Sequence, residues 1–226
     1  QCDWSSDVCF SDLASIDGGG LDDLGAIGVI GREKTTKRWL WWGHGWCHED
    51  VLELRKEIAP RLRDFAAAGE LTICREVNDD LEGMVAVIRQ LMDSGLLPEK
   101  EGIGLDPFGV AAIVDELAKI GLTFPQVVAV RQGVSLMSAL TGCARKLKDG
   151  SLVHSASGLL TWCVGNAREE QRGNAVMVTK EAAGKAKIDL LVAGLSAAKL
   201  MENNPVAGDG KGSVDDWFGS LRTRVA

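Results

Sequence analysis

Three aspartates occupy positions from which carboxylates can act together. Asp17 ends an apolar run and is followed by the glycines Gly18–Gly20. Asp106 ends the apolar run Ile103–Leu105, and Asp189 stands at the start of a long apolar segment near the C-terminus. An acid at the carboxyl end of a strand faces the crevice in which open α/β sheets bind ligands. If the strands that carry the first two acids are neighbours, the three carboxylates converge in one pocket.

Such a pocket is suited to metal chemistry. Three carboxylates in one pocket repel one another and need cations. Hard oxygen ligands select Mg²⁺ or Mn²⁺ over zinc. Two such ions, roughly 3.5 to 4 Å apart, activate a water molecule and stabilise the leaving oxygen of a phosphodiester. Aspartate is also common at strand ends and helix N-termini for capping alone, so the order of the three acids is more informative than any one of them.

Hydrophobic periodicity indicates the segments that must position these acids. Residues 14–20 predict the end of a strand that runs into a glycine-rich turn, and 26–32 and 38–46 predict two further strands; the short connections favour an antiparallel meander. The expected helices span residues 49–68 with a kink at Pro60, 81–92, 107–120, 135–147, 159–167 and 188–201. Further strands are expected over 71–75, 103–106, 127–130 and 175–179, and 152–154 is expected to be a short strand or an extended loop. This order predicts a mixed-sheet α/β domain rather than a doubly wound dinucleotide-binding unit.

Composition restricts the class of protein. A hydrophobic content of 46% with 25% charged residues is ordinary for a soluble globular chain. No apolar run approaches the roughly 18 to 20 residues that cross a membrane, and the N-terminus lacks the pattern of a signal peptide. The six cysteines are scattered and form no CxxC pair, which predicts reduced thiols in a cytosolic compartment.

The charge is unevenly distributed. The chain carries a net charge of −7, but residues 131–187 contain nine basic and four acidic side chains, a net +5 that leaves −12 for the remainder. A basic segment beside an acidic remainder is compatible with phosphate contact on one face. A solvated surface with chance asymmetry explains the charge equally well.

The first thirteen residues differ in character from the rest. The run Asp3–Leu13, DWSSDVCFSDL, is similar to the translation of a common sequencing adapter, from which it differs only at Phe10. We therefore expect residues 1–13 to be a non-native segment that follows a truncation of the gene at its 5′ side. The alternative is a genuine polar N-terminal tail.

Two clusters invite other interpretations. His44, Cys47 and His48 form an HxxCH pattern that matches no standard zinc site, so we expect them to pack or to lie at a sheet edge. The tryptophans of residues 39–46 could stack on bases, but large rings on a strand more commonly fill a core.

Three stretches resemble the nuclease domain of phage large terminase subunits. The opening of that domain resembles Ser15–Arg32, SIDGGGLDDLGAIGVIGR. Its second acidic motif resembles Gly104–Leu117, GLDPFGVAAIVDEL, and its third resembles Gly173–Met201, GNAVMVTKEAAGKAKIDLLVAGLSAAKLM. The similarity extends from Ser15 to about Pro205, and the last two motifs are the more specific because their flanking residues match as well.

The resemblance implies a ribonuclease-H-like α/β fold and a DNA endonuclease that cuts concatemeric viral DNA with two divalent metal ions. Carried over by position, the metal ligands and catalytic acids are Asp17, Asp106 and Asp189. A further acid follows the first in many members of the family. Asp23 fits its spacing best, with Asp22 as the alternative.

The resemblance also implies partners and a setting. Double-stranded DNA is the expected substrate, the portal and the small terminase subunit are the expected partners of the full-length protein, and the host cytoplasm is the expected location. Lys180, Lys185 and Lys187 precede Asp189 and could contact phosphates, although solvated lysines are equally common. Residues 14–204 are the expected nuclease domain, and 205–226 a flexible tail.

The family's ATPase motor has no counterpart in this sequence. The glycine-rich stretch Gly208–Ser213, GDGKGS, lacks the spacing of a phosphate-binding loop and follows no predicted strand. Two rival functions remain open. One is another nuclease of the same fold, such as a junction resolvase or a transposase-like recombinase. The other is a non-catalytic domain that docks the packaging motor, in which the acids serve only as caps.

Overall fold

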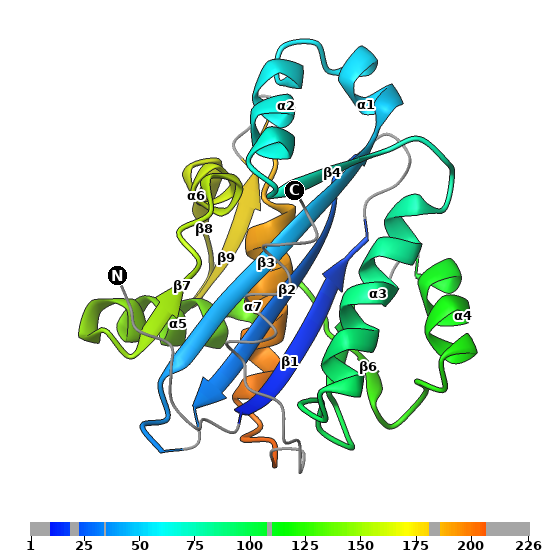
Figure 1. The fold of residues 1–226 in the computed structure, drawn as a ribbon. Helices are drawn as coiled ribbons and strands as arrows, with labels where there is room; N and C mark the ends of the chain where they lie inside the picture. Colours follow the sequence, from blue (N-terminus) through cyan, green and yellow to red (C-terminus); the bar gives the residue numbers. More distant parts are fainter. Residues whose placement is uncertain (1–9, 19–22, 34, 108–109, 181–185, 207–226) are drawn as a thin grey trace.

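A central mixed sheet organises the molecule. The computed structural model describes residues 10–18, 23–33, 35–107, 110–180 and 186–206. Within them, the strands of the main sheet follow the order β4-β3-β2-β1-β5-β6, with β7 paired to β3, and β8 and β9 form a separate hairpin (Figure 1). The strands are β1 (Phe10–Asp17), β2 (Gly25–Glu33), β3 (Trp39–His48), β4 (Leu71–Cys74), β5 (Ile103–Leu105), β6 (Val127–Ala129), β7 (Leu152–His154), β8 (Ala167–Arg172) and β9 (Ala175–Lys180).

The first three strands form the predicted antiparallel meander. Strand β1 pairs with β2, and β2 with β3, in antiparallel register. Most residues of β2 and β3 are buried, as expected for central strands covered on both faces. The meander is therefore confirmed, and it places β1 in the interior of the sheet.

The other half of the sheet is parallel to β1. Strand β5 pairs with β1 through Ala14↔Ile103 and Ile16↔Leu105, and β6 pairs with β5 in the same direction. Ser15 Oγ donates a hydrogen bond of 3.0 Å to the carbonyl of Gly104 across this pairing. The carboxyl ends of β1, β5 and β6 therefore lie at one edge of the sheet.

Helices cover both faces of the sheet. Helix α7 lies behind the sheet in Figure 1, with α5 and α6 beside it, while α3 and α4 cover the opposite face. Each face has its own apolar core, so this is a three-layer arrangement. The helices are α1 (Glu49–Leu54), α2 (Ala59–Ala67), α3 (Asp79–Asp93), α4 (Ala111–Lys119), the 3₁₀ turn η1 (Gly133–Leu136), α5 (Met137–Asp149), α6 (Gly158–Gly165) and α7 (Asp189–Met201).

Helix α7 packs unusually closely against the sheet. Nearly every one of its residues is buried. A Cβ atom added to Gly28 of β2 would stand 2.4 Å from the backbone nitrogen of Gly194, and one added to Gly194 would overlap the ring of Trp41. Two glycines therefore set the depth at which α7 lies, and with it the position of the first residue of the helix, Asp189.

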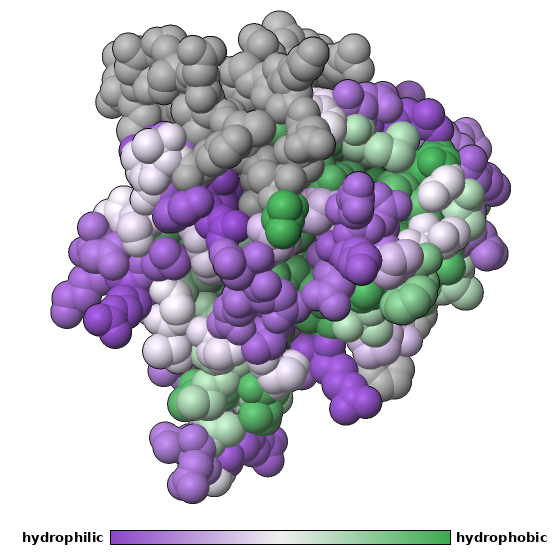
Figure 2. Space-filling view, turned by 90° about the horizontal axis from the view of Figure 1, so that it is seen from below, coloured by the Kyte–Doolittle hydropathy of each residue, from purple (hydrophilic) through white to green (hydrophobic). Residues whose placement is uncertain are grey.

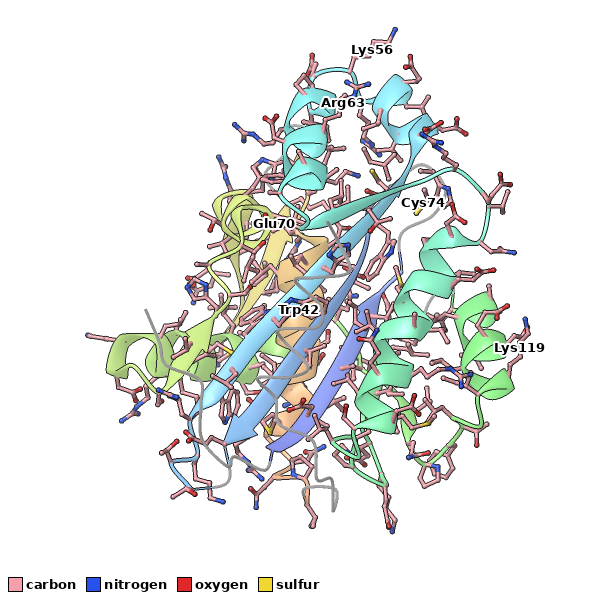
Figure 3. All side chains as sticks on the ribbon, viewed as in Figure 1. Trp42, Lys56, Arg63, Glu70, Cys74 and Lys119 are labelled. Carbon is pink, nitrogen blue, oxygen red and sulfur yellow. The ribbon has the colours of Figure 1, made fainter. Side chains whose placement is uncertain are left out.

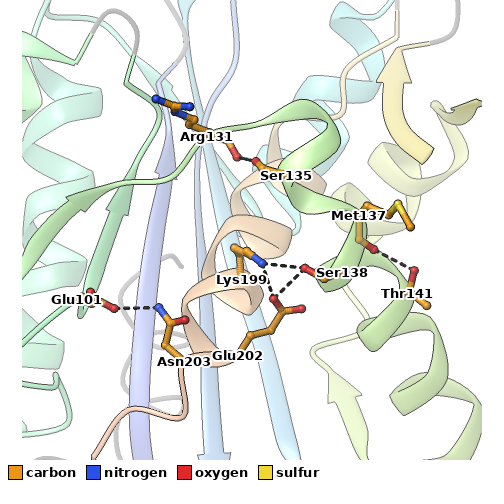
Figure 4. Close-up of polar contacts among 9 residues, drawn as sticks. All are labelled: Glu101, Arg131, Ser135, Met137, Ser138, Thr141, Lys199, Glu202 and Asn203. Atoms are coloured by element: carbon orange, nitrogen blue, oxygen red, sulfur yellow. Dashed lines mark hydrogen bonds and ion pairs between the residues drawn. The ribbon is translucent and has the colours of Figure 1, made fainter. Parts of the chain in front are cut away.

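The C-terminal end of α7 is fixed by polar contacts (Figure 4). Lys199 Nζ lies 2.8 Å from Ser138 Oγ of α5 and 2.7 Å from Glu202 Oε2, and Asn203 donates a hydrogen bond to Glu101. These contacts hold the end of the helix that lies away from its first residue.

Three predicted elements need correction, and one strand was not predicted. The helix expected over 49–68 is two helices, because Pro60 lies in the first turn of α2 rather than kinking a continuous helix. The helix expected from Pro107 begins at Ala111. The helix expected to end at Ala167 stops at Gly165, and the strand β8 that follows was not predicted. Its sequence, AREEQR, lacks apolar alternation because β8 is exposed along most of its length.

The surface is mixed. Figure 2, which views the end of the molecule away from α1 and α2, shows hydrophilic residues with smaller apolar patches between them. Among the described residues, no helix combines the length and apolar character needed to cross a membrane. Cys47, Cys74, Cys143 and Cys163 are buried free thiols, and Cys2 and Cys9 lie outside the described residues.

Candidate active site

Two of the predicted acids leave the sheet side by side. Ile16 and Leu105 are the last paired residues of β1 and β5, so Asp17 and Asp106, each one residue further, emerge at the same edge. Both side chains are partly buried. The condition set from the sequence, that the two strands be neighbours, is met.

The third acid reaches the same edge from the helix layer. Asp189 is the first residue of α7, where a negative charge is stabilised by the helix dipole. Asp189 is only 6% exposed, and its Oδ2 atom is buried without a hydrogen-bond partner. A buried, unpartnered carboxylate oxygen is costly, and a cation would satisfy it.

The electrostatics of Asp17 place the acids within reach of one another. The pKa of Asp17 is raised from 3.8 to about 7, first by burial and then by the negative charges of Asp189 and Asp106. A hydrogen bond from Gln132 and the positive charge of Lys180 act in the opposite direction. The three carboxylates therefore destabilise one another as anions, which is the situation that bound cations relieve.

Two lysines enter the acidic cluster in different ways. The Lys180 ammonium, at the end of β9, lies 3.9 Å from Asp23 Oδ2 and 3.9 Å from Asp189 Oδ1, with 46% of its side chain exposed. Lys187 is 2% exposed and its ammonium is paired with Asp23 Oδ1. Of these two lysines, Lys180 is the one that combines contact with the acids and access to solvent.

These positions refine the expectations from the sequence. Lys187 does not fit the role of a phosphate-binding side chain in this arrangement, because its charge is buried against Asp23. Asp23 and Asp189 share the Lys180 ammonium as a neighbour, and Asp23 Oδ1 also accepts a 2.8 Å hydrogen bond from the backbone of Leu24. Asp22 and Lys185 lie outside the described residues.

One residue of the site was missed from the sequence. Gln132 Nε2 donates a hydrogen bond of 2.9 Å to Asp17 Oδ1. It follows the end of β6 by three residues, at the edge where β1 and β5 also end. A polar residue just after the predicted strand 127–130 was the available signal, but strand order was needed to interpret it.

The acids do not form a closed ligand set in the arrangement shown. Among the described residues, no three His, Cys, Asp or Glu side chains stand together closely enough to hold a metal ion. The donor chemistry nevertheless fits a hard divalent cation, because every acidic donor is a carboxylate oxygen and Asp189 Oδ2 has no partner.

The HxxCH segment serves packing. His44 Nε2 lies 2.9 Å from Thr72 Oγ1, its ring stacks on Trp42, which is labelled on β3 in Figure 3, and its edge meets Trp46. Burial lowers the pKa of His44 to about 4. His48 lies 3.5 Å from Asp80, so both histidines have partners in the fold.

Comparison with known proteins gives a consistent picture. The family model described as "Terminase large subunit, endonuclease domain" matches residues 55–203, more than half of the chain and a range that includes Asp106 and Asp189. Asp17 lies upstream of it. No curated protein matches the chain by sequence.

Solved structures extend the similarity to most of the chain. The large terminase of bacteriophage HK97 matches with a TM-score of 0.69 at 20% identity, over 86% of this chain and 40% of that one. The large terminase nuclease of thermophilic phage G20c, solved with bound magnesium, matches with a TM-score of 0.50 at 14% identity, over 87% of this chain and 83% of that one. At these identities the likeness establishes the fold, which is the ribonuclease-H-like mixed sheet expected from the sequence. The chain spans less than half of the HK97 protein.

Proposed function

We propose, because this chain belongs to the endonuclease-domain family of terminase large subunits, that it hydrolyses phosphodiester bonds of double-stranded DNA in a metal-dependent reaction. The observation that supports the proposal is the placement of Asp17 and Asp106 at the same sheet edge, with the charge of Asp189 acting on Asp17 and with Asp189 Oδ2 buried and unpartnered. Caps alone do not account for that geometry, because an acid that caps a helix uses its oxygens on backbone N–H groups.

The residues have distinct roles in this proposal. Asp17, Asp106 and Asp189 would hold two divalent ions, Mg²⁺ or Mn²⁺. When bound, such ions activate water for in-line attack on phosphorus and neutralise the leaving oxygen. The magnesium in the related G20c nuclease supports this choice of metal.

The lysines divide the remaining work. Lys180 is placed to contact a phosphate beside the scissile bond, because its exposed ammonium lies next to Asp189. Lys187 holds Asp23 in place from the interior. Asp23 is a supporting metal ligand in this proposal. Lys187 pairs with its Oδ1, which leaves Oδ2 as the oxygen that can bind a metal.

The biological role follows from the family. We propose that the nuclease cuts concatemeric viral DNA during genome packaging in the host cytoplasm, within a longer protein that contacts the portal and the small terminase subunit. The match to 40% of the HK97 large terminase supports the idea that this chain is one part of such a protein.

Plasmid cleavage tests the proposal. The purified chain is incubated with supercoiled DNA in Mg²⁺, in Mn²⁺ and in chelator, beside Asp106→Ala, Asp189→Ala and, as a matched control, Asp115→Ala, which changes an exposed acid of α4. We expect metal-dependent cutting that falls in the first two variants by more than the roughly 10- to 100-fold typical of outer-sphere residues. Asp115→Ala should cut normally.

The rival functions predict other outcomes. A folded chain that neither cuts DNA nor binds a divalent ion would overturn the catalytic proposal and favour a docking domain. Cutting restricted to branched DNA would instead indicate a resolvase-like enzyme of the same fold.

A further inference from the structure

Gln132 makes a contact that neither its position on the surface nor its local turn requires. Its side-chain amide donates to Asp17 Oδ1 at 2.9 Å, across 115 positions of sequence. Since β5 lies between β1 and β6 in the sheet, the amide crosses the end of β5, where Asp106 emerges. The side chain of Gln132 therefore reaches Asp17 past the end of the strand that carries Asp106.

The backbone that presents Gln132 is well fixed. Val130 N donates to Leu105 O at 2.8 Å, so pairing with β5 continues past the end of β6. Ser135 Oγ closes the turn into η1 by donating to the carbonyls of Arg131, as Figure 4 shows, and of Gln132. The amide is thus delivered from a closed turn rather than from a free loop.

We propose that Gln132 is a positioning residue that orients the Asp17 carboxylate for a divalent cation. This inference rests on the proposed function. A carboxylate on a single rotatable bond presents either oxygen to the site, and the amide holds Oδ1 toward β6. Because Oδ1 accepts the amide N–H, Oδ2 is the oxygen that this contact leaves to the metal. Such partners of metal ligands fix ligand orientation and strengthen binding.

The test measures metal binding directly. Calorimetric titration with Mn²⁺ and with Mg²⁺ is compared for the unsubstituted chain, Gln132→Met and Gln132→Asn. Methionine keeps the length of the side chain but cannot donate, and asparagine keeps the amide but is one methylene too short to reach Asp17. Gln126→Met is the control, because Gln126 lies at the other end of β6.

We expect about a 10-fold weaker metal affinity in both Gln132 variants, within the range for partners of metal ligands, and no change in Gln126→Met. The melting temperature without metal should stay the same in all variants, while its rise on adding Mg²⁺ should shrink in the Gln132 variants alone. A purely structural residue would lower the metal-free melting temperature instead.

The outcomes separate the two proposals. If the unsubstituted chain binds metal and both Gln132 variants bind it equally well, the positioning role is wrong and the proposed function stands. If the unsubstituted chain binds no divalent ion, the proposed function fails and this inference fails with it.

Discussion

At the scale of single residues, Asp12 is the most costly side chain of the sheet. It lies in β1 with no exposed surface, and neither carboxylate oxygen has a hydrogen-bond partner. Burial raises its pKa from 3.8 to about 7. Its neighbours on that face belong to the apolar core beneath α3, so an ionised Asp12 opposes folding.

The pH dependence has a definite sign. Below pH 4 Asp12 is protonated in the folded and unfolded states, so folding carries no cost from burying its negative charge. Between pH 4 and 7 only the unfolded state loses its proton, so stability falls as pH rises. We expect Asp12 to contribute a loss of about 4 kcal/mol that levels off above pH 7, measurable by denaturant unfolding across this range as the difference between the unsubstituted chain and a variant without the Asp12 carboxylate.

Asp12→Val should remove that penalty. Valine suits a buried strand and carries no charge, so the melting temperature at pH 8 should rise by several degrees, at roughly 2 to 4 °C for each kcal/mol. Asp12→Asn is the control, because it removes the ionisation but keeps a buried polar group. It should remove the Asp12 part of the pH dependence and leave the part that comes from Asp17, with a smaller gain in stability. Equal pH profiles in all three proteins would contradict this account.

Asp12 also bears on the origin of the first thirteen residues. A polar residue buried without a partner in a central strand is a local conflict between sequence and fold. We propose that it reflects the non-native segment expected from the resemblance to a sequencing adapter. The native residue at this position would then be apolar, as Ala14 and Ile16 on the same face are.

The site was predictable to the extent that single residues mark strand ends. Asp17 and Asp106 could be located because an acid directly follows an apolar run, and Asp189 because a helical repeat begins there. Gln132 could not be assigned, since its role depends on the strand order β1-β5-β6. The burial of Lys187 was also hidden, because lysine is rarely found without solvent unless it is paired.

At the scale of elements, α7 carries both the packing of one face and an acid of the site. Its close approach to β2 depends on Gly28. Gly28→Ala would place a methyl group against the backbone of Gly194, and backbone cannot move aside as a flexible side chain does. We expect a loss of about 1 to 3 kcal/mol, measured by denaturant unfolding, together with weaker Mg²⁺ binding because Asp189 moves with the helix.

A second glycine provides the matched control. Gly142 lies within α5, and an added Cβ would meet nothing within 4 Å. Gly142→Ala should therefore stabilise the protein by roughly 0.5 to 1 kcal/mol, the usual difference between these residues in a helix. Destabilisation in both variants would mean that the effect at Gly28 does not come from helix approach.

Helices and strands that bury a face in the core could be predicted from the sequence, whereas those that bury none could not. The meander and helices α3 and α7 follow from apolar periodicity that their burial preserves. Strand β8 is exposed along most of its length, so its charged sequence carries no such pattern. The break between α1 and α2 was misjudged because the apolar spacing continues across Pro60, which suits the first turn of a new helix as well as a kink.

One helix end depends on a contact across the chain. Glu70, labelled near the end of α2 in Figure 3, accepts hydrogen bonds from the backbone nitrogens of Gly158 and Leu159 at 2.9 and 2.7 Å. A carboxylate at this position accepts hydrogen bonds from N–H groups that have no partner within the helix, and its negative charge interacts favourably with the helix dipole. No sequence pattern pairs Glu70 with the start of α6, because they are far apart along the chain.

At the scale of the whole molecule, the net charge of −7 repels the DNA phosphates. The affinity for DNA therefore depends on where the positive side chains lie. Lys180→Gln should weaken DNA binding and reduce by about one the slope of log affinity against log salt concentration. Lys56→Gln is the control, since Lys56 is exposed at the turn between α1 and α2 (Figure 3). Fluorescence anisotropy across a salt series measures both, and equal slopes would exclude Lys180 from phosphate contact.

The pairing of β1 with β5 has a consequence for synthesis. Ser15 and Gly104, which meet across these strands, are 89 residues apart, and Asp189 belongs to the last helix described. Chains emerge from the ribosome N-terminus first, and contacts between distant segments form late. A nascent chain therefore holds Asp17 long before it holds Asp189. The three acids can come together only after α7 has been translated, so under the proposed function the nascent chain gains no cutting site before this helix is made.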